Sequence, residues 1–149
     1  RSAAKFQRRI PMFNKQQPKS LIVVGAGAIG MEFGYFYHTM GTKVTVIEMM
    51  PRILPVEDDD ICTAMEKLYR KHGMEIRTNT GVVNIEKTGG GVKVTVAPMV
   101  AGADGKMSAD QSKKETIEAE KVLLAIVHVY EIIISNELPC FFNFFQHSF

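Results

Sequence analysis

Residues 25–30 carry the strongest chemical signal in this chain. They read Gly25-Ala26-Gly27-Ala28-Ile29-Gly30, with glycine at the first, third and sixth positions. The first glycine permits a tight turn, the second lets the backbone approach a pyrophosphate, and the third lets a helix pack closely on a sheet. A helix that begins near Ala28 also directs unpaired N–H groups and the positive end of its dipole towards phosphate. The spacing therefore predicts a dinucleotide-binding turn.

The glycine motif is weak by itself, because glycine is common, and it needs the right flanking elements. An apolar run, Leu21 to Val24, precedes the motif and is typical of a buried strand. A helical pattern follows it, and a second β-type run, Val44 to Ile47, ends on Glu48. An acidic residue about 20 positions after the motif matches the dinucleotide fingerprint. The alternative is a glycine turn in an ordinary βαβ unit with a surface glutamate.

Glu48 also bears on the choice of cofactor. Its carboxylate can accept hydrogen bonds from both hydroxyl groups of an adenosine ribose, whereas a 2′-phosphate would meet like-charge repulsion. Arg52 lies four residues further on, but it follows Pro51 and need not point at the ribose. We therefore expect NAD rather than NADP.

Other chemically capable residues give weaker signals. Cys62 and Cys140 are isolated and the four histidines are scattered, so we expect no metal site, and we assign no catalytic residue. The acidic run Glu57 to Asp60 is interpreted as helix capping and first-turn acids, with a divalent metal site as the alternative. A net charge of +2 gives no reason to expect nucleic acid or a membrane as partner.

The elements that position these residues alternate between strand and helix. The pattern from Met31 to Met40 predicts an apolar helix that Gly41 closes, with Glu32 in its first turn. A second helix follows the acidic run and ends at His72-Gly73, and a third strand covers Met74 to Thr78. Three strands with two helices between them form a βαβαβ unit, so we expect a Rossmann-like α/β fold with a parallel sheet and crossing helices.

The period then changes to two, which is typical of antiparallel strands. Runs at residues 82–86 and 92–96 flank Gly89 to Gly91 and predict a hairpin. Pro98 to Lys114 is expected to be a mobile polar loop, and Thr116 to Glu118 a third short strand of a β-meander. Lys121 to Ile126 is a buried type of strand and is expected to return to the parallel sheet.

The two ends of the chain differ from its centre. Residues 1–17 are basic and aperiodic, and they are interpreted as a linker or remnant of an upstream domain rather than as a transit peptide. Residues 127–149 contain five Phe in the last nine positions, which would expose a large apolar surface. The run from Val122 to Ile134 is too short to span a membrane.

Several segments together resemble the central NAD-binding domain of dihydrolipoamide dehydrogenases, within the flavoprotein disulfide reductases. The resemblance covers residues 18–126 and rests on Pro18 to Phe33, Gly41 to Glu48, Pro51 to Pro55, Asp58, Thr78 to Val82 and Ala119 to Ile126. It implies that the NAD pyrophosphate and nicotinamide side contact residues 25–32, namely Gly25, Ala26, Gly27, Ala28, Ile29, Gly30, Met31 and Glu32. It further implies that Glu48 holds the adenosine ribose and that Val82 lies at the adenine edge.

The resemblance also implies an activity that this chain cannot perform unaided. Full-length members oxidise dihydrolipoamide through a redox disulfide and FAD, and pass the electrons to NAD. They act as homodimers within 2-oxo acid dehydrogenase complexes, in the cytoplasm or the mitochondrial matrix. The family's reactive cysteine pair, its FAD site, its His-Glu pair and the flavin-domain lysine that would meet Glu32 are missing from this sequence.

The sequence departs from the family pattern after Ile126, where a glycine and a polar segment are expected. We interpret residues 127–149 as sequence that is not native to the family and that arises from a frame shift or an unspliced stretch. Sequencing of the transcript would test this interpretation. Two alternatives to the dehydrogenase interpretation remain open. In the first alternative, the chain is the NAD domain of another flavoprotein, such as an NADH oxidase. In the second, it is a truncated fragment without function.

Overall fold

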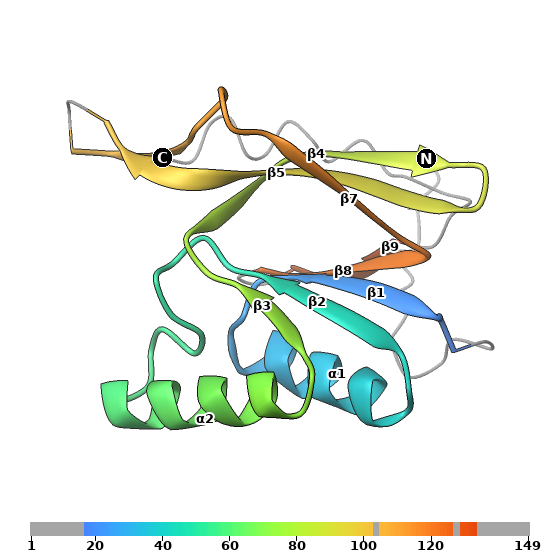
Figure 1. Ribbon diagram of the computed structural model, residues 1–149, viewed down its shortest axis with the longest axis horizontal. Coiled ribbons are helices and arrows are strands. Elements are labelled where there is room, and N and C mark those ends of the chain that lie inside the picture. The colour runs from blue at the N-terminus through green and yellow to red at the C-terminus, as the bar shows by residue number, and fades with distance from the viewer. Residues whose placement is uncertain (1–16, 103–104, 127–128, 134–149) are drawn as a thin grey trace, which may run out of the picture.

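The computed structural model describes residues 17–102, 105–126 and 129–133 of the chain. They form three layers, with two helices on one face of a central sheet and an antiparallel sheet on its other face (Figure 1). The helices are α1 (Ala28–Thr39) and α2 (Asp59–Lys71). The strands are β1 (Ser20–Val24), β2 (Lys43–Ile47), β3 (Glu75–Arg77), β4 (Thr80–Thr88), β5 (Gly91–Ala101), β6 (Met107–Ala109), β7 (Glu115–Ala119), β8 (Lys121–Ile126) and β9 (Val129–Ile133).

The central sheet has the strand order β3-β2-β1-β8-β9. Strands β3, β2, β1 and β8 are parallel, and β9 pairs with β8 in the antiparallel direction. The expected βαβαβ unit and the return of residues 121–126 to the parallel sheet are therefore confirmed. Because β1 lies between β2 and β8, the turn that follows it is held at the centre of the sheet.

The alternation of side chains along β1 explains why the sheet needs a layer on each face. Leu21 and Val23 belong to the core on the helix side, whereas Ile22 and Val24 belong to the core beneath the antiparallel sheet. Successive strand residues point to opposite faces, so an uninterrupted apolar run is stable only when both faces are covered. The same rule places Val122 and Leu123 of β8 in different cores.

Both predicted helices form, with two corrections. Gly41 has a φ of +93°, the left-handed conformation expected where α1 ends. Asp59 and Asp60 lie in the first turn of α2, as interpreted, but the side chain of Asp58 at the N-cap makes no capping hydrogen bond. The first turn of α1 contains no acidic residue, because residues 28–31 already complete it and Glu32 follows.

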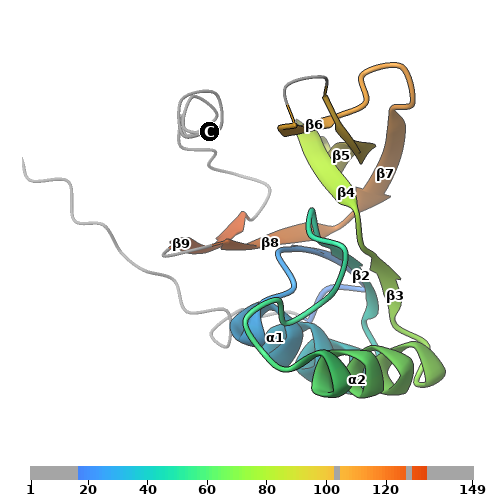
Figure 2. The same ribbon diagram turned by 90° about the vertical axis from the view of Figure 1, so that its left-hand side faces the viewer.

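The antiparallel sheet contains the predicted meander of β4, β5 and β7 (Figure 2). The expected loop from Pro98 to Lys114 is wrong, because β5 continues to Ala101 and pairs with β6. Val100 and Met107 are exposed in this extension, so no buried face imposes an apolar and polar alternation on its sequence. The predicted hairpin between β4 and β5 is confirmed.

Two sequence predictions concern features that the described residues can be searched for. Within residues 17–102, 105–126 and 129–133, no helix is long and apolar enough to cross a membrane. The same part of the chain holds no group of three or more His, Cys, Asp or Glu side chains suited to a metal ion. Cys140 and most of the segment 127–149 lie outside the described residues, as do residues 1–16.

Candidate functional site at the carboxyl end of the parallel strands

The glycine turn begins at Gly25, directly after β1. Gly25 has a φ of +100°, and its N–H donates to the carbonyl of Ile47 over 2.8 Å. A Cβ at this position would lie 2.6 Å from the carbonyl oxygen of Ala125 in β8. Both the backbone conformation and the close approach of β8 therefore require glycine here. The sequence predicted the turn, but it did not reveal that Ala125 is the neighbour.

Gly27 and Gly30 have opposite surroundings. A Cβ on Gly30 would collide with the carbonyl oxygen of Gly25 and would lie 3.2 Å from the Cβ of Ala125. A Cβ on Gly27 would meet no atom within 4 Å, so the backbone at Gly27 faces open space. Gly30 thus serves the packing of α1, as predicted. The glycine at residue 27 has no packing reason within the described part of the chain.

The amino end of α1 faces this open space. Gly27 is its N-cap, and the N–H of Met31 donates to the Gly27 carbonyl over 3.0 Å. The N–H groups of Ala28, Ile29 and Gly30 in the first turn have no acceptor within the helix. These donors and the positive end of the helix dipole form an arrangement suited to an anion.

Glu48 lies at the end of β2 and is buried, with 7% of its surface exposed. Its Oε2 accepts the N–H of Ala26 over 2.7 Å, and its Oε1 accepts the N–H of Met50 over 2.8 Å. The alternative interpretation of Glu48 as a solvated surface charge is therefore wrong. Each carboxylate oxygen has a second lone pair, so these bonds leave Glu48 able to accept further donors.

A second loop, residues 49–57, supports the glycine turn, and sequence reasoning missed this contact. The N–H of Leu54 donates to the carbonyl of Ala26 over 2.8 Å, and Ile53 is fully buried beside it. Leu54 adopts a φ of +49°, which is uncommon for a residue other than glycine. The buried thiol of Cys62 in α2 donates to the Leu54 carbonyl over 3.1 Å. The apolar pair Ile53-Leu54 between two prolines was the available signal.

The remaining predicted site residues lie around this edge at different distances from the glycine turn. Glu32 is exposed on α1 beyond the open N–H groups. Burial raises the pKa of the Tyr69 hydroxyl, and electrostatic interactions with Tyr35 and Glu32 raise it further. Val82 is half-buried and packs against the core beneath the antiparallel sheet. The N–H of Thr80, two residues earlier, donates to the Glu48 carbonyl over 2.9 Å.

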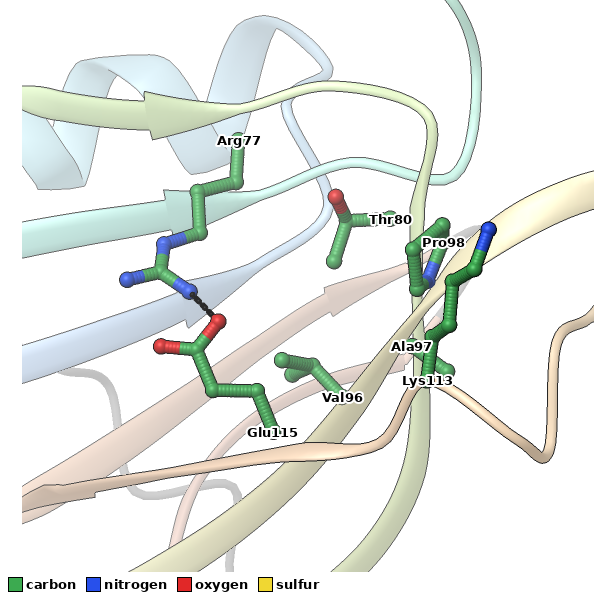
Figure 3. Close-up of a pocket in the computed structure, with 7 residues that line it drawn as sticks. All are labelled: Arg77, Thr80, Val96, Ala97, Pro98, Lys113 and Glu115. Carbon is green, nitrogen blue, oxygen red and sulfur yellow. Dashed lines mark hydrogen bonds and ion pairs between the residues drawn. The ribbon is translucent and has the colours of Figure 1, made fainter.

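A small pocket of about 110 Å³ lies beside the end of β3, between the two sheets. Its lining includes Arg77, Thr80, Lys113 and Glu115 (Figure 3). Arg77 donates to Glu115 over 2.8 Å and to Glu75 over 2.7 Å, so two carboxylates already compensate its charge. None of the residues that line this pocket is a predicted site residue, and the ion pair between Arg77 and Glu115 joins β3 to β7.

Comparison with known proteins identifies relatives of this arrangement. The family described as pyridine nucleotide-disulphide oxidoreductase matches residues 20–105. A dihydrolipoyl dehydrogenase from Mycobacterium tuberculosis strain H37Rv is 43% identical over 115 residues, which are 77% of this chain and 22% of that protein. A dihydrolipoyl dehydrogenase from Rhizobium etli is 41% identical over 109 residues, or 73% of this chain and 20% of that protein. The chain thus spans about a fifth of these curated relatives.

Solved structures give the same picture. The crystal structure of LpdA from Mycobacterium tuberculosis aligns with a TM-score of 0.60 and 31% identity, covering 76% of this chain and 22% of that one. A water-forming NADH oxidase from Lactobacillus brevis bound to NADH aligns with a TM-score of 0.55 and 25% identity, covering 72% of this chain and 20% of that one. The resemblance inferred from the sequence is confirmed.

Proposed function

Because the chain belongs to the pyridine nucleotide-disulphide oxidoreductase family, we propose that it binds NAD(H) at the carboxyl end of its parallel strands. The observation that carries this proposal is the open space at Gly27 beside the first turn of α1. An L-residue can adopt the φ of −69° found at Gly27, and its Cβ would meet nothing, so folding does not explain the glycine. Close approach of a pyrophosphate does explain it.

The residues present fit such a ligand. The N–H groups of Ala28, Ile29 and Gly30 would hold the pyrophosphate, with the helix dipole adding to the attraction. Glu48 would accept hydrogen bonds from the ribose hydroxyls through its remaining lone pairs. Its negative charge disfavours a 2′-phosphate, so the proposed cofactor is NAD rather than NADP. The nicotinamide ring supplies hydride transfer when it is bound; the chain supplies position and charge.

Two further contacts extend the proposed site away from the glycine turn. Val82 would border the adenine, because β4 starts next to Glu48. Glu32 would lie towards the nicotinamide side, since it follows the open N–H groups along α1. Met31, which the sequence also assigned to this side, is buried in the core between α1 and the sheet, so its side chain does not face the proposed cofactor. The exposure of Glu32 leaves it available to a partner domain.

The parent protein is proposed to be a dihydrolipoamide dehydrogenase. The identities of 41–43% to dihydrolipoyl dehydrogenases support this choice over an NADH oxidase. Dihydrolipoamide oxidation in the parent also needs FAD and a redox disulfide, whereas the sequence of residues 18–126 contains one cysteine and no second glycine fingerprint. The chain is therefore proposed to be the NAD platform of a larger enzyme, with no turnover of dihydrolipoamide by itself. Lipoamide-dependent activity of the full-length parent separates it from an NADH oxidase.

Titration of the purified chain with NADH, followed by nicotinamide fluorescence, tests the proposal. We expect saturable binding that Gly27→Val abolishes, because the new side chain fills the space over the turn. Gly89→Val is the matched control, since Gly89 also has no atom within 4 Å of an added Cβ but lies in the β4–β5 hairpin. Absence of binding by a folded chain, or equal loss in both variants, would contradict the proposal.

A further inference from the structure

The loop that follows Glu48 contains one cation, Arg52, within residues 49–57. Both sides of Arg52 are tied to the proposed site. Met50 donates to the Glu48 carboxylate over 2.8 Å, and Leu54 donates to the Ala26 carbonyl over 2.8 Å. The backbone of Arg52 is therefore held next to the position proposed for the adenosine ribose.

The Arg52 side chain is nevertheless engaged elsewhere. Its Nη2 donates to the Pro55 carbonyl over 3.1 Å, and its Nη1 forms an ion pair with Asp59 in the first turn of α2. These two contacts use both terminal nitrogens of the guanidinium group. Since a guanidinium binds phosphate best through two parallel N–H bonds, Arg52 must turn away from Pro55 and Asp59 before both terminal nitrogens can face a phosphate together.

We propose that Asp59 is a specificity-determining residue for the nucleotide, because it keeps Arg52 away from the ribose. This inference rests on the proposed function. An NADP site usually offers an arginine to the 2′-phosphate, and Arg52 is the residue of loop 49–57 able to do so. Two carboxylates then favour NAD over NADP in different ways. Glu48 repels the 2′-phosphate, and Asp59 binds Arg52, the cation that would otherwise attract this phosphate.

The exposure of this ion pair makes the effect modest and easy to release. The side chains of Arg52 and Asp59 are 37% and 84% exposed. Exposed ion pairs are weak, so neutralising Asp59 removes the charged partner of the guanidinium without disturbing a core and leaves only the hydrogen bond to the Pro55 carbonyl. Glu48 still opposes a 2′-phosphate in such a variant, and NAD therefore remains the preferred nucleotide.

The test compares NADH and NADPH binding to the chain and to three variants. Asp59→Asn is expected to raise NADPH affinity relative to NADH by about two- to fivefold. Asp60→Asn is the matched control, because it removes one exposed acid from the same helix turn. The double variant Asp59→Asn with Arg52→Gln is expected to lose the gain.

The outcomes separate this inference from the proposed function. No NADH binding by the unmutated, folded chain contradicts both. NADH binding with an unchanged NADPH-to-NADH ratio in Asp59→Asn contradicts the role of Asp59 and leaves the NAD site standing. An equal gain in Asp60→Asn, or a gain that survives Arg52→Gln, assigns the effect to general charge and also overturns the role of Asp59. Circular dichroism of each variant confirms that the comparison is between folded proteins.

Discussion

The two ends of the parallel strands use similar hydrogen bonds for different purposes. At the amino end, the Lys19 N–H donates to the Glu120 carboxylate over 2.7 Å, and the Thr42 hydroxyl donates to the Pro18 carbonyl over 2.8 Å. Each of these hydrogen bonds joins two segments of the chain and pairs a donor of one with an acceptor of the other. At the carboxyl end, Glu48 binds the backbone of Ala26 and Met50, but the turn that it shapes surrounds open space at Gly27.

The comparison shows that the candidate site is held by hydrogen bonds of the same kind as those at the opposite end of the sheet. The buried carboxylate of Glu48 holds the carboxyl end, and side chains of Glu120 and Thr42 hold the amino end. What distinguishes the candidate site is its remaining donors, since the first N–H groups of α1 have no acceptor within the helix. Changes at the carboxyl end should therefore affect stability, binding or both according to the residue, whereas changes at the amino end should affect stability alone.

The largest effect is expected for Gly30→Ala. Its added Cβ would collide with the backbone of Gly25, so the free energy of unfolding should fall by about 3 kcal/mol. Gly27→Ala is the partner variant and should change stability by less than about 0.5 kcal/mol while it weakens NADH binding. Urea unfolding and NADH titration measure the two quantities. Similar stability losses in both variants would remove the distinction between the two glycines.

Glu48→Ala is expected to affect both quantities. It leaves two N–H donors without their carboxylate in a buried site, which should lower the free energy of unfolding by about 2 kcal/mol. It should also weaken NADH binding by at least tenfold, because the ribose loses its acceptor. Glu48→Gln keeps a carbonyl oxygen for one donor and should lose less stability than Glu48→Ala. A fully stable Glu48→Ala variant would show that the two hydrogen bonds contribute little.

Thr42→Val probes the amino end. Thr42 is buried, and valine has nearly the same shape but lacks the hydroxyl donor for Pro18. The free energy of unfolding should fall by about 1 kcal/mol, and the dissociation constant for NADH should stay the same. A changed NADH affinity at a temperature where the variant is folded would mean that the two ends are coupled through the sheet.

The smallest effect is expected from acid. Burial alone would raise the pKa of Glu75, but hydrogen bonds and charge from Arg77, aided by Thr45 and Lys43, outweigh it and lower the pKa below 4.5. The stabilisation by this carboxylate is therefore full above about pH 5 and is lost as pH falls through the lowered value. Stability of Glu75→Gln should depend less on pH below 4.5. An identical acid profile in both proteins would contradict this assignment.

Local patterns predicted most of the parallel unit, because its strands and helices bury apolar faces. Leu21 to Val24 fill two cores, and Gly41 closes α1 at the expected residue. The sequence did not predict the β5–β6 extension, because Val100 and Met107 are exposed. With no buried face, the paired strands show no alternation of apolar and polar residues. Strands of this kind are defined by backbone hydrogen bonds, which every residue except proline can both donate and accept.

The candidate site was predicted in its residues but not in its contacts. The spacing predicted the turn at Gly25 and the close packing at Gly30, which the surroundings of both residues confirm, whereas the role of Gly27 towards a pyrophosphate stays a prediction. The Glu48 carboxylate accepts hydrogen bonds from Ala26, which is distant in sequence, and from Met50 in an irregular loop. No periodic pattern in the sequence predicts such contacts. The ion pair between Arg52 and Asp59 could not be predicted either, because the direction of the Arg52 side chain depends on the conformation of a proline-containing loop.

The central position of β1 has a consequence for the order in which the molecule opens. Strand β1 is paired on both sides, to β2 and β8, and four of its residues are buried. Its amide protons should therefore exchange with solvent deuterium only through global unfolding, while amides of the exposed β5–β6 arm exchange through local fraying. The glycine turn follows β1 directly. If the chain binds nucleotide there, the exchange rate of the β1 amides should fall by the same factor as the equilibrium constant for global unfolding.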